Sequence, residues 1–358
     1  MAVATVSGAH PVFDPLDDEG LRGRLIAFLQ AEGLSAVSIG PMRRYTVGFS
    51  WVTYGLICTW CPAGSSTAIT RDLILRVGPP QGIFGPYQAG PQFHALKALG
   101  DSGVPVPGVW WFSDDTTVLG APFFVCDRVE GEAPLPWTAD GGPAFDEATR
   151  GVLGAQFLDA LVALHRFDWR GTGAEALSGA RDPAATATAE IDFWEERIHR
   201  WSTRRQPLLE WAVHWFRAHA PVADRVSIVH GDYRIGNFLE GGGRITAILD
   251  WELVHLGDPM EDLGWICLQA WRGRSPFLCH LLTREELAEG YERATGRPVD
   301  ARAVRYWEAF GTFKLAVMHL AAAYSFGTLG SNDLRMAGMG AQFPRVLAQM
   351  ETALERVA

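Results

Sequence analysis

Apolar residues recur with two different periods, and the first third of the chain carries the period typical of strands. Residues 45–56 are rich in β-branched and aromatic side chains with small residues in the middle, which predicts a strand, a turn and a second strand. Within this first third, helical spacing is found over residues 21–31 and 91–99. Further strands are expected over residues 68–77, 110–112 and 121–131. The pattern therefore predicts an N-terminal lobe built on strands.

After residue 133 the apolar spacing changes to three and four residues, which is the period of a helix that faces a core. Helices are expected over residues 145–167, 190–220 (as one or two), 263–271, 284–294, 302–324 and 343–357. The helix expected over residues 284–294 should begin at a capping box, because Glu286 follows Thr283 by three residues. We expect an α+β chain with an N-terminal lobe over 1–130 and a mostly helical lobe over 131–358.

One stretch between these helices, residues 229–264, places polar residues at fixed spacing. Asp232 and Asn237 lie five residues apart on a predicted loop, and Asp250 follows Asp232 by 18 residues. Two strand-like runs flank three consecutive glycines at 241–243, which predicts a hairpin that returns Asp250 to the loop. Two carboxylates and one amide oxygen are hard ligands suited to Mg²⁺.

The run HGDYRIGN, followed by LDWE and GDPMEDL, resembles the aminoglycoside phosphotransferase family of small-molecule kinases. It resembles in particular a branch that includes kinase domains fused to acyl-CoA dehydrogenases. The resemblance implies a bilobal protein-kinase-like fold with an antiparallel sheet in the N-terminal lobe. It also implies an ATP-dependent phosphotransferase, with GTP possible in place of ATP, that uses Mg²⁺ and acts on a hydroxyl of a small molecule.

In that assignment Asp232 accepts or orients the acceptor hydroxyl, Arg234 faces the transferred phosphate, and Asn237 and Asp250 bind Mg²⁺. Neighbouring residues are expected to support them. His230 should organise the loop through backbone hydrogen bonds, and His165 should be a hydrogen-bonded structural residue. By the same resemblance, two aspartates of GDPMEDL brace the loop, namely Asp258 and Asp262, although Asp258 before Pro259 also fits a helix start.

The resemblance assigns nucleotide-binding roles in the N-terminal lobe as well. Gly48 and Ser50 are expected at a turn where backbone N–H groups approach phosphate. Arg76 ends a predicted strand and is expected to hold the phosphates. Main-chain groups of a hinge are expected to meet adenine, at Val125, Asp127 and Val129.

Gln92 departs from the family pattern, because relatives carry a glutamate there that pairs with the phosphate-holding cation. Glutamine can hydrogen-bond Arg76 but cannot neutralise it, and an unpaired buried charge is costly. This departure is the one feature that supports an alternative of another class, a catalytically inactive nucleotide-binding regulatory module. The presence of Asp232, Asn237 and Asp250 argues against that alternative.

The acceptor is left open by the motifs. An aminoglycoside needs a pocket lined with acids, whereas a hydroxyacyl thioester or another apolar alcohol suits an aromatic and aliphatic pocket with basic residues near a CoA phosphate. The tryptophan-rich helices over 190–220 and the closest branch favour a hydroxyacyl-CoA-like acceptor. An aminoglycoside or macrolide antibiotic kinase is the alternative.

Composition and charge argue against several kinds of partner and cellular location. The net charge of −10 over 358 residues argues against a nucleic-acid partner. No apolar run reaches the ~18–20 residues that cross a bilayer, and no signal peptide is apparent, so no membrane association and a cytoplasmic location are expected. Cys58 and Cys61 form a C-x-x-C without a second pair, and packing is favoured over zinc or redox chemistry. The oligomeric state does not follow from the sequence.

Overall fold

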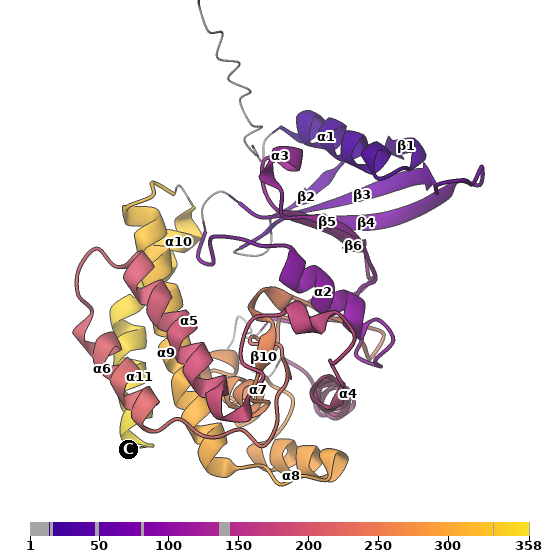
Figure 1. Cartoon of the computed structure of the whole chain (residues 1–358). Helices are drawn as coiled ribbons and strands as arrows, with labels where there is room; N and C mark the ends of the chain where they lie inside the picture. The colour runs from indigo at the N-terminus through magenta and orange to yellow at the C-terminus, as the bar shows by residue number, and fades with distance from the viewer. Residues whose placement is uncertain are drawn as a thin grey trace, which may run out of the picture. The chain divides into compact units, whose positions relative to one another are not determined.

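The computed structural model describes residues 14, 17–46, 50–79, 82–135, 144–331 and 333–357 (Figure 1). The chain divides into two compact units. The first contains the described residues up to Phe93 together with Gly108–Arg128. The second contains His94–Pro107 and the described residues from Val129 onward.

The first unit is built on one antiparallel sheet of six strands in the order β1-β3-β4-β6-β5, with β2 also paired to β3. Its strands are β1 (Ser35–Ile39), β2 (Arg43–Tyr45), β3 (Val52–Cys61), β4 (Ile69–Val77), β5 (Val109–Ser113) and β6 (Phe123–Asp127). The predicted N-terminal sheet is therefore confirmed.

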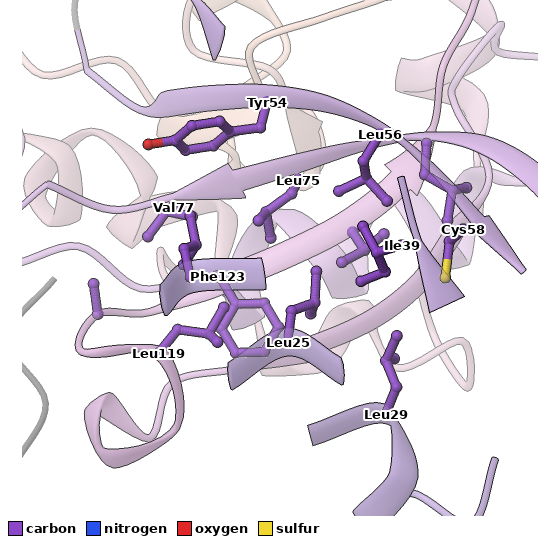
Figure 2. Packing of buried hydrophobic residues seen from close by; sticks show 14 of the residues in the cluster. Leu25, Leu29, Ile39, Tyr54, Leu56, Cys58, Leu75, Val77, Leu119 and Phe123 are labelled. Carbon is purple, nitrogen blue, oxygen red and sulfur yellow. The ribbon is translucent and has the colours of Figure 1, made fainter. Parts of the chain in front are cut away.

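Helix α1 (Asp18–Ala31) packs on one face of this sheet. It begins where the side chain of Asp17 accepts a hydrogen bond from the backbone of Gly20, and it buries one leucine face at positions 21, 25 and 29. These leucines pack against alternate residues of the strands, because alternate side chains of a strand point to one face of the sheet. Figure 2 shows this core, with Leu25 beside Phe123 and with Tyr54 and Leu75 above them.

The second unit is mostly helical. Its helices are α4 (Glu147–Arg166), α5 (Thr186–Trp201), α6 (Pro207–Ala218), α7 (Met260–Ile266), α8 (Arg284–Thr295), α9 (Ala301–Gly327), α10 (Leu334–Ala341) and α11 (Phe343–Glu355). Helix α9 is the long central one, and α5, α7, α10 and α11 all pack on it (Figure 1). The capping box at Thr283 and Glu286 is confirmed.

Two small antiparallel pairs complete the second unit. Strand β7 (Ser227–Val229) pairs with β10 (His255–Gly257), and β8 (Phe238–Gly241) pairs with β9 (Arg244–Ile248). The second pair confirms the predicted hairpin. Its turn residues Gly242 and Gly243 have φ of 62° and 75°, as a type I′ turn requires.

Short helical segments depart from the predictions. The helix expected over 263–271 is wrong as one element: α7 ends at Ile266, Leu268 is extended, and a 3₁₀ turn follows at Gln269–Trp271. The run is buried on nearly all sides, so its apolar period could not mark the end of the helix. Two helices were not anticipated, α3 (Thr116–Leu119) and α10, whereas α2 (Gly90–Leu99) was.

Two expectations from composition can be compared with the fold. The cysteines at 58 and 61 are three residues apart on β3, so their side chains point to opposite faces and cannot share one ion. All five cysteines are buried and free, and burial raises the pKa of the Cys58 thiol to about 11. Within the described ranges, no helix is both long and apolar enough to cross a membrane.

Candidate active site

The predicted catalytic residues lie on the loop that connects β7 to β8 in the second unit. The hairpin β8–β9 returns the chain to this loop. The backbone N–H of Leu249 donates to the carbonyl of Asn237 at 2.8 Å, and the Leu249 carbonyl accepts from Nε2 of His230 at 2.9 Å. Asp250 is the next residue, so the structure brings it to the loop as the sequence predicts.

The carboxylate of Asp232 is held by three donors. Oδ1 accepts from Nε of Arg234 at 2.8 Å and from the indole Nε1 of Trp265 at 2.7 Å, while Oδ2 accepts from Nδ2 of Asn237 at 2.6 Å. A carboxylate oxygen has about two acceptor positions, so Oδ1 is saturated by these bonds and Oδ2 has one position left. Asp232 is itself buried, with 9% of its surface exposed.

Asn237 and Asp250 present oxygen atoms suited to a cation. Both protons of the Asn237 amide are directed to Asp232, one to its main-chain oxygen at 2.9 Å and one to Oδ2, so the amide oxygen points away from that residue. Asp250 has a left-handed backbone with φ of 66°, which side chains other than glycine seldom adopt. Such a conformation is kept where a side chain must take one direction. This donor set fits Mg²⁺.

Arg234 lies against Asp232 and is partly buried. Its Nη1 donates to the carbonyl of Ile235 at 3.0 Å, and its guanidinium lies 4.4 Å from the ring centre of Trp271. Burial alone would lower the pKa of Arg234, but the charges of Asp232 and Asp250 outweigh it and raise the pKa. The arginine is thus a fixed positive charge beside both carboxylates.

Asp262 holds the backbone at the start of the catalytic loop. Its carboxylate accepts from the backbone N–H of His230 at 2.8 Å and of Gly231 at 2.9 Å, and it contacts Nε2 of His165 at 3.0 Å. Burial raises the pKa of Asp262, but the hydrogen bond from His165 and the charge of the histidines reverse this and lower it. The expected bracing role of this aspartate agrees with these contacts.

His165 and His230 form hydrogen bonds that hold the loop and its surroundings in place. His165 is buried between Asp262 and the hydroxyl of Tyr291, at 2.9 Å from the latter. His230 organises the loop, because its Nδ1 accepts from the backbone N–H of Asp232 while its Nε2 donates to a backbone carbonyl.

Asp258 lies just before helix α7 and accepts from its first backbone N–H rather than bracing the loop directly. It accepts from the backbone of Met260 and from the indole of Trp307, each at 2.9 Å. Burial raises the pKa of its carboxyl to about 6. The contacts fit the helix-start alternative that the sequence left open.

Trp265 is the site residue that the sequence reasoning missed. It stands in an apolar run at helical spacing, where a tryptophan is expected in the core, and it is indeed 1% exposed. No local pattern signals that its indole N–H reaches Asp232, 33 residues earlier in the chain.

The predicted nucleotide-binding residues belong mainly to the first unit. Arg76 is on β4, opposite Thr53 of β3 and Phe124 of β6, and its guanidinium lies 6.0 Å from the ring centre of Trp51. Ser50 is buried, and Gly48 lies outside the described residues.

The hinge residues follow on β6. Val125 and Asp127 are in that strand, and the Asp127 carboxylate accepts from the indole of Trp110 at 2.7 Å. Val129 comes directly after Arg128 and belongs to the second unit. Gln92 is buried on α2, and its Oε1 accepts no hydrogen bond from a described residue. A replacement of the usual glutamate by Gln92 stays a prediction.

A cavity of about 1060 Å³ lies elsewhere in the second unit, between α8, α9, α11 and the segment from Leu268 to Arg274. Half of its lining residues are aliphatic, and the lining also contains five arginines and one glutamate. Arg284 is bound by both oxygens of Glu308, at 3.0 and 2.8 Å. The other four form no ion pair with a described residue: Arg274, Arg305, Arg345 and Arg356.

The chain is similar to one family model, to several curated proteins and to many solved structures. A model of the phosphotransferase enzyme family matches residues 66–307. Human acyl-CoA dehydrogenase family member 11 is 26% identical over 298 residues, which are 80% of this chain and 37% of that protein. The chain spans between 18% and 38% of the length of the matched relatives named acyl-CoA dehydrogenase family members 10 and 11.

Solved structures agree in fold. One from Ralstonia eutropha, described as a candidate aminoglycoside phosphotransferase, superposes with a TM-score of 0.67 at 22% identity, over 93% of this chain and 98% of that one. An aminoglycoside phosphotransferase in complex with GDP and kanamycin superposes with a TM-score of 0.56 at 15% identity, over 94% and 99%. At such identities the likeness establishes the kinase-like fold.

Proposed function

Because the chain belongs to the phosphotransferase enzyme family, we propose that it transfers the γ-phosphoryl group of a nucleoside triphosphate to a hydroxyl of a small molecule. The observation that carries this proposal is the carboxylate of Asp232. Three donors fix it, and one acceptor position of Oδ2 is left for the acceptor hydroxyl.

In the proposed reaction Asp232 orients the acceptor hydroxyl through Oδ2. The acceptor oxygen forms a bond to the γ-phosphorus while the bond from that phosphorus to the β-phosphate oxygen breaks. The hydroxyl proton passes to Asp232, and the nucleoside diphosphate leaves. Phosphoryl transfer depends chiefly on such alignment and on charge stabilisation. Arg234 has Nη2 left beside Asp232 to meet the transferred group, because its Nε and Nη1 are already engaged.

We assign the metal to Asn237 and Asp250, whose oxygens fit it as described above. When bound there, Mg²⁺ would neutralise charge on the β- and γ-phosphates. The nucleotide is assigned to the first unit, with Arg76 on its phosphates, backbone N–H groups near Gly48 and Ser50 at the same phosphates, and the adenine at a hinge over residues 125–129. ATP is the expected donor and GTP the alternative, since one family neighbour was solved with GDP.

For the acceptor we favour a hydroxyacyl-CoA-like molecule. The cavity beside α9 supports this choice. The segment from Leu268 to Arg274 along it includes Trp271, against which Arg234 packs. The aliphatic wall of the cavity suits an acyl chain, and its four arginines without an acidic partner suit phosphates. The same charges would repel the ammonium groups of an aminoglycoside. The names of the curated relatives point the same way. An aminoglycoside or macrolide kinase is the alternative, supported by the fold neighbours.

The activity is tested by measuring acceptor-dependent nucleoside diphosphate formation with ATP or GTP and Mg²⁺. The panel contains hydroxyacyl-CoAs, the free hydroxy acids, aminoglycosides and macrolides. We expect turnover with a hydroxyacyl-CoA and a lower KM than for the free acid. Phosphorylation of an antibiotic with no turnover of any hydroxyacyl-CoA would exclude the favoured acceptor.

The site is tested with Asp232→Asn, which keeps the shape of the side chain but removes the charge. We expect kcat to fall by ~10²–10⁴, the range for a positioned acid–base group. The matched control is Asp168→Asn, at an exposed aspartate that pairs only with Arg170, and it should keep wild-type kcat. Equal activity of both variants would refute the assignment, and the absence of any turnover in the wild type would support the inactive regulatory module.

A further inference from the structure

A buried cluster of charges lies directly behind the catalytic loop. It consists of Glu190 on α5, His255 on β10, Glu261 on α7 and Lys314 on α9, each at most 5% exposed. Burial of four ionisable side chains is costly unless each is paired and hydrogen-bonded. Their contacts show that they are, and that one of them reaches the loop.

The ammonium of Lys314 has two hydrogen-bond acceptors and lies near two tryptophan rings, with that of Trp194 at 5.6 Å. It donates to Oε1 of Glu261 at 2.7 Å and to the carbonyl of Gly231 at 3.0 Å, and it lies 4.8 Å from the ring centre of Trp265. Gly231 precedes Asp232 in the chain, and Trp265 donates to the carboxylate of Asp232. Lys314 therefore contacts two groups next to Asp232: the backbone before it, and the indole that donates to its carboxylate.

His255 completes the charge balance. Its Nδ1 faces the carbonyl of Leu253 at 2.9 Å, and a carbonyl only accepts, so Nδ1 carries a proton. Its Nε2 faces two carboxylate oxygens, of Glu261 at 3.2 Å and of Glu190 at 3.4 Å. Burial lowers the pKa of His255, but the charges of these two carboxylates outweigh burial and raise it to about 9, so Nε2 carries a proton at neutral pH. The positive charges of Lys314 and His255 then balance the negative charges of Glu190 and Glu261. Glu190 also accepts a hydrogen bond from the indole of Trp194 at 3.2 Å.

The residue type at position 314 is itself informative. The chain has 31 basic residues, of which two are lysines: Lys97, which is exposed, and Lys314. A lysine ammonium is a compact point charge, whereas a guanidinium is wide and planar. A site enclosed by Glu261, Gly231 and Trp265 fits the former, in a chain that otherwise uses arginine.

We propose that Lys314 is a positioning residue for phosphoryl transfer, whose buried ammonium, anchored by Glu261, holds the Gly231 carbonyl and the Trp265 indole so that Asp232 keeps its orientation. The proposal rests on the proposed function of Asp232. His255 contacts Glu261 at Oε2, whereas Glu190 contacts His255 and Trp194 and forms no hydrogen bond or ion pair with the described residues of the loop. The same three residues, Glu190, His255 and Glu261, have ligand atoms within 4.8 Å of one another, so a bound metal is the competing interpretation.

The test compares Lys314→Met combined with Glu261→Gln, which removes both charges of the pair, with Glu190→Gln and Lys97→Met. Glu190→Gln perturbs the same cluster without touching the loop, and Lys97→Met removes the other lysine. We expect the double variant to lower kcat of the folded protein by 10- to 100-fold with nucleotide KM changed less than threefold. Both controls should keep kcat, although Glu190→Gln should lower stability. Equal kcat in the double variant and in Glu190→Gln would overturn the proposal.

A second measurement needs neither activity nor a substitution in the cluster. With ε-¹⁵N-lysine, the wild type should give two ammonium signals, and Lys97→Met should identify that of Lys314 as the one in slow exchange with water. A rapidly exchanging Lys314 signal, or one equivalent of a tightly bound transition metal in the purified protein, would also overturn the proposal. Failure of the proposed function is distinguishable, because it leaves the wild type without turnover while this signal persists.

Discussion

Replacing Asp262 by asparagine should destabilise the second unit by at least about 2.5 kcal/mol. In the wild type Oδ1 accepts from Gly231, and Oδ2 accepts from His230 and faces His165. Whichever way the asparagine amide turns, its NH₂ group meets a backbone N–H. The variant then loses one hydrogen bond to a charged acceptor, worth about 1.5–3 kcal/mol, and leaves a buried donor unsatisfied, which costs about 1–3 kcal/mol.

Urea unfolding followed by tryptophan fluorescence measures this effect at pH 7. With a slope of about 3 kcal/mol per molar urea, the midpoint should fall by roughly 0.8 M at unchanged slope. The control is again Asp168→Asn, an exposed ion pair whose loss should change stability by about 0.5 kcal/mol or less. Similar midpoints for the two variants would refute the reasoning, because the loop would not then depend on its buried carboxylate.

The pH dependence gives the same test another readout. Since the pKa of Asp262 is lowered in the folded protein, its contribution is present at pH values above the unfolded pKa and is lost as the pH falls through the folded one. The asparagine variant lacks this contribution. Its midpoint should therefore fall less steeply than that of the wild type on acidification.

Three further predictions concern stability and use the same unfolding assay. The folded protein raises the pKa of His255 from 6.5 to about 9, so this residue stabilises the fold by about 3 kcal/mol below pH 6.5, and the stabilisation is lost as the pH rises through 9. His255→Gln should abolish this fall of stability between pH 6.5 and 9, and an unchanged fall would contradict the reasoning. Thr283→Ala should cost about 1 kcal/mol by removing the capping box of α8. Gly242→Ala should cost about 1 kcal/mol, because its φ is 62° although the space around it is open. Gly23→Ala, at an exposed position of helix α1, should instead stabilise the protein, and a change of stability in the same direction for both variants would contradict the backbone argument.

The site residues whose proximity the sequence predicted are close together in the chain. Asp232, Asn237 and Asp250 lie within one loop and the hairpin that follows it, and the turn glycines alone specify how that hairpin closes. Local spacing therefore predicts their proximity without knowledge of the rest of the fold. The antiparallel sheet of the first unit was also predictable from local sequence, since runs of β-branched and aromatic residues mark its longer strands.

The supports of the site depend on contacts between distant parts of the chain, and these leave no local pattern. Lys314 follows Gly231 by 83 residues, and its role depends on how α9 packs on α7. Trp265 and the aliphatic residues around it have the same apolar character in sequence. A helix end inside a fully buried run, as at Ile266, is invisible to periodicity because no polar face is present to mark the turn.

Helix α7 shows how one buried element combines packing with support of the site. At about 100° per residue, Glu261, Asp262 and Trp265 fall within an arc of about 100° on one side of the helix. Each reaches a different target: Lys314, the loop N–H groups and the carboxylate of Asp232. Leu263 falls about 100° beyond this arc, in the buried core. All of these residues are buried, so hydrophobic patterning treats them alike, yet the polar arc alone contacts the catalytic loop and its braces. The orientation of Asp232 is therefore specified by a helix that begins 28 residues later in the chain, and by the long helix on which that helix rests.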